Sequence, residues 1–161
     1  MPVMVPDDAT FADGDFLEDA LLERMLKAER ERDEFADVAA VTIGIRWKRI
    51  GGKERGNLRL AQISKASPIL HHLTDLDFVV WVAADHLRRQ TEVAGMVFAR
   101  LVEAILYHEL CHLAYEPEDG VVSLKGHDFE GFIQEIQTHG LWKEELTRVK
   151  NTMQQLNMFE K

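Results

Sequence analysis

The sequence has a single cysteine, four prolines and no apolar run longer than seven residues. Because Cys111 stands alone, the chain cannot form an internal disulfide, which is typical of proteins in a reducing cytoplasm. The longest apolar runs, residues 78–84 and 93–99, fall far short of the ~18 to 20 residues that cross a bilayer. The sequence therefore predicts a protein with no membrane segment.

The first residues of the sequence have little in common with a secretory leader, so we expect the protein not to be exported. The first 15 residues carry four aspartates, where a leader would carry basic residues followed by an apolar core. We therefore expect a cytoplasmic protein.

Nothing in the composition divides the chain into several parts. No repeat, linker or biased tract interrupts its 161 residues, and 46% apolar with 29% charged residues is a globular composition. We expect a flexible N-terminus over residues 1–14 and a single domain over residues 15–161.

Basic charge is scarce, since 19 basic residues face 28 acidic ones and the net charge is −9. This balance argues against a domain coated in basic surface for nucleic-acid binding. Residues 46–65 are the exception, because seven of them are basic and only Glu54 is acidic. Arg46, Lys48 and Arg49 are therefore candidate nucleic-acid contacts, while a solvated face or a partner for the acidic N-terminal region explains them equally well.

Hydrophobic periodicity predicts an α+β fold with an N-terminal helix, a short three-stranded sheet, a long buried helix and C-terminal helices. Asp13 or Asp15 is the expected N-cap of the first helix. In chain order, the expected elements are a helix over residues 15–35, a hairpin of residues 38–50 and 57–64 around Gly51-Gly52, a buried strand over 77–84, a helix over 91–115, a loop over 116–126, a short helix over 127–139 and a final helix over 142–156.

The long helix contains the pattern HExxH, formed by residues 108–112. His108 and His112 are four residues apart, so they project from one helical face and can bind one zinc ion. Glu109 is placed to deprotonate a water that the metal activates. The alternative, two histidines packed in a hydrophobic helix, would require desolvation of two imidazoles and a carboxylate together.

A catalytic zinc site also needs a third protein ligand. The metzincin extension of the motif is excluded, because it requires Gly and His where this chain has Tyr115 and Glu118. His127 is the best candidate, since Gly126 lets the loop return toward the long helix; Glu130 and His139 are the alternatives.

Two short segments together resemble known families. The HELCH run of residues 108–112, followed by KGHDFEGF at residues 125–132, resembles the SprT-like zincins and the putative phage metallopeptidase family over roughly residues 38–142. The resemblance implies zinc on His108, His112 and His127, with Glu109 as general base. It also implies a small zincin-like fold in which a short sheet packs on the active-site helix.

The resemblance further implies a phage-encoded zinc metallopeptidase, in the cytoplasm of a bacterial host, that acts on proteins or peptides, including DNA-bound proteins. Tyr115 is a candidate donor to an oxyanion and Trp81 a candidate for a strand edge that holds substrate, although packing explains both residues as well. Two other hypotheses remain open. The first is a non-catalytic, zinc-stabilised binding module, and the second is a DNA-associated protein that uses the basic hairpin of residues 46–65.

Overall fold

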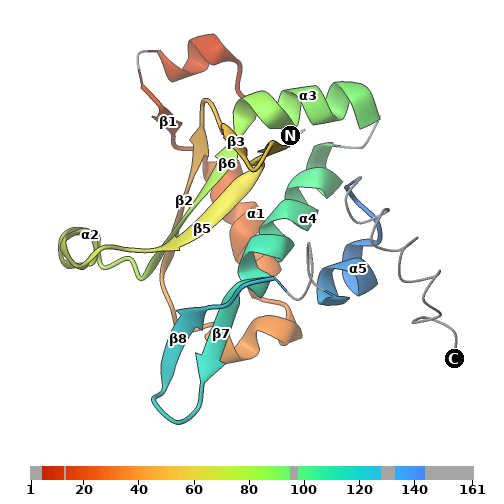
Figure 1. Ribbon diagram of the computed structural model, residues 1–161. Coiled ribbons are helices and arrows are strands. Elements are labelled where there is room, and N and C mark those ends of the chain that lie inside the picture. The colour runs from red at the N-terminus through yellow and green to blue at the C-terminus, as the bar shows by residue number, and fades with distance from the viewer. Residues whose placement is uncertain (1–4, 13, 95–97, 128–132, 144–161) are drawn as a thin grey trace, which may run out of the picture.

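The computed structural model describes residues 5–12, 14–94, 98–127 and 133–143 (Figure 1). Its helices and strands alternate irregularly along the chain, which confirms the α+β class. The helices are η1 (Asp8–Phe11), α1 (Ala20–Arg30), η2 (Asp33–Val38), α2 (Pro68–Thr74), α3 (Ala84–Ala94), α4 (Phe98–Cys111) and α5 (Ile133–His139). The strands are β1 (Phe16–Leu17), β2 (Ile43–Lys48), β3 (Lys53–Glu54), β4 (Asn57–Leu58), β5 (Ala61–Lys65), β6 (Phe78–Ala83), β7 (Leu113–Glu116) and β8 (Val121–Leu124).

The main sheet has four strands in the order β1-β2-β6-β5, one more than the sequence predicted. β2 runs parallel to β6, whereas β1 and β5 are antiparallel to their neighbours. The predicted hairpin was wrong, because β2 and β5 lie on either side of β6. β6 is apolar on both faces, which suits the centre of a sheet, and its two edges can accept both strands.

Gly51 packs against the end of β6 instead of turning the chain from β2 directly into β5. A Cβ atom at this position would lie 2.4 Å from the Ala83 Cβ and 2.5 Å from the Arg59 carbonyl oxygen, so no side chain fits there. The chain then forms the separate small hairpin β3-β4 before it enters β5.

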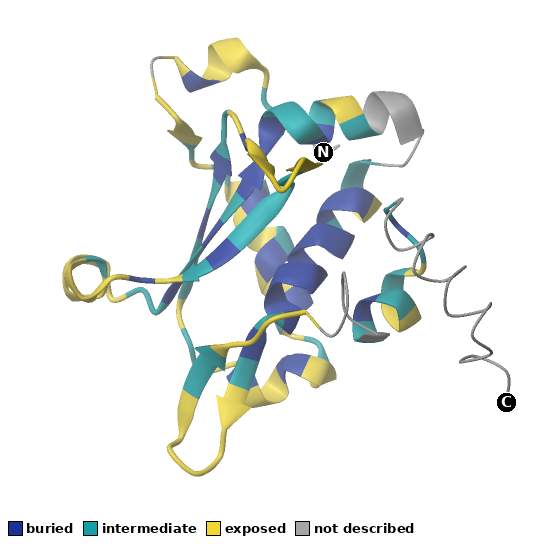
Figure 2. Cartoon of the chain, in the orientation of Figure 1, coloured by how far each residue is buried: buried dark blue, intermediate teal, exposed yellow. Residues whose placement is uncertain are grey.

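One face of the sheet makes the core with α1 and α4 (Figure 2). Its buried side chains alternate along the strands, as a sheet with one covered face requires. They include Ile45, Trp47, Ile63, Val80 and Val82. The opposite face carries Arg46, Trp81 and Gln62 in one cross-strand row, and these residues are only partly buried.

The first helix is shorter than predicted, because it begins after Asp19 rather than after Asp13 or Asp15. The Asp19 carboxylate accepts a hydrogen bond from the backbone N–H of Leu21 at 2.9 Å, which caps α1. Its other oxygen accepts from the indole N–H of Trp47 at 2.9 Å, so the cap also joins α1 to β2.

We expect Trp47→Phe to lower the free energy of unfolding by about 1–3 kcal/mol, because the change leaves a small cavity and removes the bond to Asp19. Urea denaturation measures the difference. Trp81→Phe, on the partly exposed face of the same sheet, is the matched control and should cost less than about 1 kcal/mol. Equal losses in the two variants would contradict this account of the core.

The predicted helix over residues 91–115 and the loop over 116–126 were also wrong. α4 ends at Cys111, and β7 and β8 then form an antiparallel hairpin. Its turn contains Gly120, whose φ of 64° favours glycine. Short apolar runs fit a strand as well as a helix, so the periodicity could not separate the two.

The two ends of the chain are described only in part. Residues 8–11 lie in the segment predicted to be flexible, yet they form η1, and Phe11 is buried in the core. Of the expected helix over residues 127–139, the structure describes α5 (Ile133–His139), while residues 128–132 lie outside the described residues. The expected final helix lies outside the described residues from position 144 onward. Among the described helices, none has the length and apolar character that crossing a bilayer requires.

Candidate metal centre

Three histidines from two parts of the chain meet at the C-terminal end of α4. His108 lies in the last turn of α4, His112 directly follows the helix and His127 follows β8. Each of the three rings has one nitrogen that could bind a metal, and these three nitrogens all lie within 4.8 Å of one another. The structure therefore brings together the three histidines that the sequence singled out.

The β7-β8 hairpin fixes the orientation of His112. Its ladder continues past Leu113 and Leu124, because the backbone N–H of Lys125 donates to the His112 carbonyl at 2.7 Å. The His112 ring lies 2.7 Å, through Nδ1, from the Lys125 carbonyl oxygen. A carbonyl only accepts, so Nδ1 carries the proton and Nε2 keeps its lone pair.

His108 is oriented by a carboxylate from α5. Its Nδ1 lies 2.6 Å from Oε2 of Glu135, which is fully buried. With the proton on Nδ1, the lone pair of His108 is on Nε2, which lies 2.9 Å from Nε2 of His127. In both His108 and His112 the lone pair is thus on Nε2.

The environment of His127 favours its neutral form. Partial burial, with His108 and His112 close by, lowers the pKa of His127 to about 4. The ring is therefore uncharged at neutral pH, the form in which histidine binds a metal.

The donor set fits a zinc ion. A tetrahedral zinc site with bonds of about 2.1 Å places its ligand nitrogens about 3.4 Å apart, which is within the spread of the three histidines. Among the described residues three side chains offer ligand nitrogens, which is the number of protein ligands in a catalytic zinc site. Nδ1 of His108 contacts a carboxylate, and Nδ1 of His112 contacts a backbone carbonyl. Both groups are usual outer partners of metal-binding histidines.

Glu109 is anchored between α4 and the edge of the sheet. Its Oε2 accepts the backbone N–H of Ile63 at 2.8 Å, and the side chain is 6% exposed. Leu60 bonds to Ala83 of β6 and Ala66 to Asp77 just before β6, so by the alternation of the ladder Ile63 points its N–H away from β6. The carboxylate, one residue after His108 in the chain, therefore lies at the side of β5 that has no partner strand among the described residues.

The other predicted site residues are not part of the histidine cluster among the described residues. Trp81 is on β6, which pairs with β2 and β5, so its strand is not an edge and the packing alternative fits it. Tyr115 lies on β7 and is 44% exposed. His139 packs on the Tyr107 ring, with its Nε2 4.0 Å from Glu29. Glu130 falls outside the described residues.

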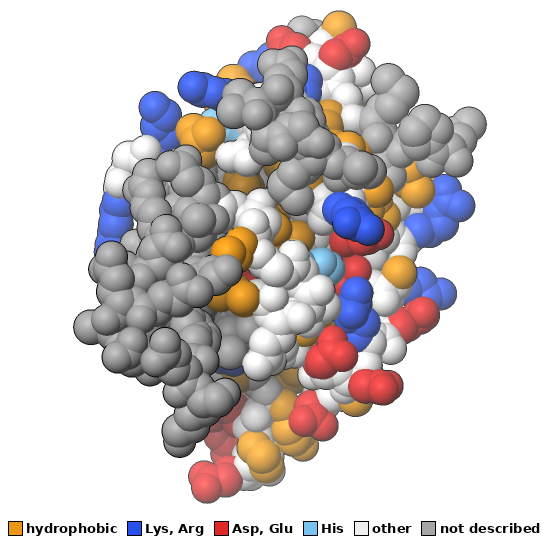
Figure 3. Space-filling model, turned by 90° about the vertical axis from the view of Figure 1, so that its right-hand side faces the viewer, with side chains coloured by type: hydrophobic (Ala, Val, Ile, Leu, Met, Phe, Trp, Pro, Cys, Tyr) orange, Lys and Arg blue, Asp and Glu red, His pale blue; other side chains and the backbone are white. Residues whose placement is uncertain are grey.

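The candidate nucleic-acid contacts are each engaged by other side chains. Arg46 lies 3.7 Å from Glu18 and 3.4 Å from Glu23, and Arg49 lies 3.8 Å from Asp8. The Lys48 ammonium lies 4.5 Å from the centre of the Trp81 ring. Figure 3 shows a similar mixture on another face, where basic side chains lie beside acidic ones. Nucleic-acid contact by these residues stays a prediction.

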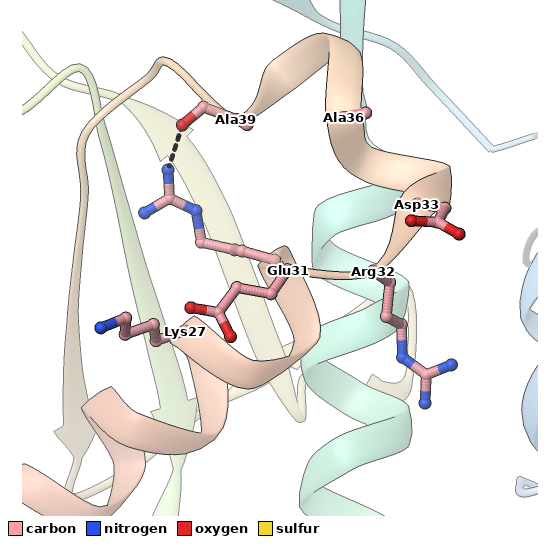
Figure 4. Close-up of a pocket in the computed structure, with 7 residues that line it drawn as sticks. Lys27, Glu31, Arg32, Asp33, Ala36 and Ala39 are labelled. Carbon is pink, nitrogen blue, oxygen red and sulfur yellow. Dashed lines mark hydrogen bonds between the residues drawn. The ribbon is translucent and has the colours of Figure 1, made fainter.

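A surface pocket of about 440 Å³ lies between α1 and η2, away from the three histidines (Figure 4). Arg30 crosses it to donate to the Ala39 carbonyl at 3.4 Å, while Lys27 and Glu31 line the same side. None of its lining residues belongs to the histidine cluster.

Sequence reasoning missed three groups that shape the site: the Glu135 carboxylate, the Lys125 carbonyl and the Ile63 N–H. The two backbone groups have no signature in a sequence. A glutamate between Ile133 and Ile136 on a short helix was a weak sign of a buried carboxylate.

A family model described as "Putative phage metallopeptidase" matches residues 14–157. A comparison with curated proteins gives no match, and neither does a comparison with solved structures.

Proposed function

The chain belongs to the putative phage metallopeptidase family, and from this membership and the histidine cluster we propose that it is a zinc-dependent peptidase. The observation that carries the proposal is the convergence of His108, His112 and His127, with Glu109 adjacent. A purely structural zinc site would need no carboxylate base next to its ligands, so the intact Glu109 favours catalysis over a binding module.

His108, His112 and His127 would hold the metal through neutral imidazole nitrogens. When bound, zinc polarises a peptide carbonyl as a Lewis acid and lowers the pKa of water toward ~7. Glu109 would take the proton from the attacking water and then give it to the leaving amine. Its bond to the Ile63 N–H engages one carboxylate oxygen, so the other oxygen is the one assigned to the proton.

The free edge of β5 would position an extended peptide substrate. β5 pairs with β6 on one side only within the described sheet. The outward N–H of Ile63 is bonded to Glu109, so a peptide would pair with the outward backbone groups on either side of Ile63, close to that carboxylate. An added peptide strand pairs with such an edge through main-chain bonds, which places its own carbonyls in a regular row. A protein or peptide with an accessible extended segment is therefore the expected substrate class.

Metal removal tests this function. We expect a fluorescently labelled, unfolded protein substrate to be cleaved by the zinc-loaded protein, and cleavage to stop after the zinc is chelated and dialysed away. One equivalent of zinc per chain should restore cleavage, because the three histidines bind one ion. Undiminished cleavage by protein shown to be metal-free by elemental analysis would contradict the proposal.

A further inference from the structure

Glu135 is a buried carboxylate that takes no direct part in the proposed mechanism. It lies on α5, and its side chain is 0% exposed. A carboxylate in such a place is costly unless hydrogen bonds compensate for the lost water. Its contacts therefore indicate what keeps it there.

Two contacts of Glu135 with described residues converge on one oxygen. Oε2 lies 2.6 Å from Nδ1 of His108 and 3.3 Å from the indole nitrogen of Trp142. The indole N–H can only donate, so Oε2 acts as an acceptor toward Trp142. The ring of Trp142 also lies near that of His108, with centroids 6.1 Å apart, and the indole is buried. Trp142 thus donates to the Glu135 carboxylate and lies near the His108 ring, so it helps to hold the two in contact.

We propose that Glu135 is a positioning residue, which holds the proton of His108 on Nδ1 and turns Nε2 toward His112 and His127. The inference rests on the proposed metal site. A histidine that lost this partner could adopt the other tautomer or rotate, and either change would remove its lone pair from the cluster.

The proposal makes metal affinity depend on a helix that carries none of the three histidines. α5 packs on α4 and brings Glu135 to His108, while Trp142 follows α5 directly. Because the zinc-competent geometry needs α5 in place, zinc binding should in turn stabilise the packing of α5 against α4. Amide hydrogen exchange over residues 133–139 should therefore slow when zinc is added to the metal-free protein.

Zinc affinity of two Glu135 variants, measured by competition with a chromophoric chelator, tests the proposal. We expect Glu135→Ala to weaken zinc binding by up to about 100-fold, since it removes both the acceptor and the charge. Glu135→Gln keeps an acceptor of nearly the same shape, so we expect a smaller loss, about 10-fold. The absorption spectrum of the cobalt-loaded protein should change in the same order, because it reports the ligand geometry.

Glu29→Gln is the matched control. Glu29 is a carboxylate of similar burial, 5% exposed, that lies on α1, pairs with Arg32 at 2.8 Å and lies 4.0 Å from His139 of α5. The variant tests whether loss of a buried charge that touches α5 but not His108 also weakens the metal, and we expect it to lower stability while its zinc affinity changes less than that of Glu135→Gln. Affinities of both Glu135 variants within twofold of wild type, or an equal loss in Glu29→Gln, would overturn the positioning role. Should Glu135→Ala fail to fold, Glu135→Gln alone decides by the same criterion. A folded wild type that binds no zinc would overturn the metal site itself.

Discussion

Replacing Glu109 with glutamine should lower the rate of peptide hydrolysis by about 10²- to 10⁴-fold while zinc stays bound. The amide keeps the shape of the side chain, and its oxygen can still accept the Ile63 N–H, so the local structure should persist. What the variant loses is the ability to accept a proton. The measurement is kcat on a quenched peptide, together with zinc content per chain by elemental analysis.

Glu103→Gln provides the comparison for this result. Glu103 is on the same helix, α4, but it lies more than one turn away from the histidines and is only partly buried. This variant should retain nearly the activity of the wild type. If Glu109→Gln retained full activity in a preparation free of other peptidases, Glu109 could not be the general base.

Replacing His127 with alanine should cause the largest loss of metal. Outer partners of a ligand contribute about 10- to 100-fold to affinity, and removal of a ligand itself should exceed that range. Only His108 and His112 would remain of the cluster, and two nitrogens do not complete a zinc site with three protein ligands. Zinc content after gel filtration should fall from one per chain in the wild type to nearly none, and hydrolysis should fall with it.

His139→Ala is the informative partner of this variant, because His139 was an alternative third ligand in the sequence. Its ring packs on Tyr107 and its Nε2 faces Glu29, so we expect its zinc content to equal that of the wild type. The opposite pattern, with zinc lost in His139→Ala and kept in His127→Ala, would move the third ligand to α5. If both variants kept their zinc, Glu130 would be the remaining candidate for the third ligand.

The parts of the site that sequence predicted are those encoded locally or by a short motif. His108 and His112 are four residues apart on a helix, so their shared direction follows from helix geometry alone. His127 was preferred because Gly126 precedes it, with Glu130 and His139 as alternatives, and the resemblance to the SprT-like and phage families implied the same ligand. That family is confirmed by the model match, and the three histidines are found together.

The parts that sequence missed depend on which elements become neighbours in space. Glu135 reaches His108 only because α5 packs on α4, and no spacing rule relates positions 108 and 135. The sheet shows the same limit, since the apolar patterns predicted strands in the regions of β2, β5 and β6 but not their order. Proximity in the chain favoured a β2-β5 hairpin, whereas β6, which is apolar on both faces, took the central place.

The β7-β8 ladder determines which insertions and deletions the metal site can tolerate. His112 and Lys125 are the last pair of that ladder, so the metal centre is at one end of the hairpin and the turn around Gly120 is at the other. Residues added or removed in the turn, at positions 117–120, change only its length and leave the pairing of His112 intact. A single residue deleted within β7 would shift every pair by one and turn each side chain of that strand to the opposite face. Natural variation in length is thus expected in the turn and not in the strands.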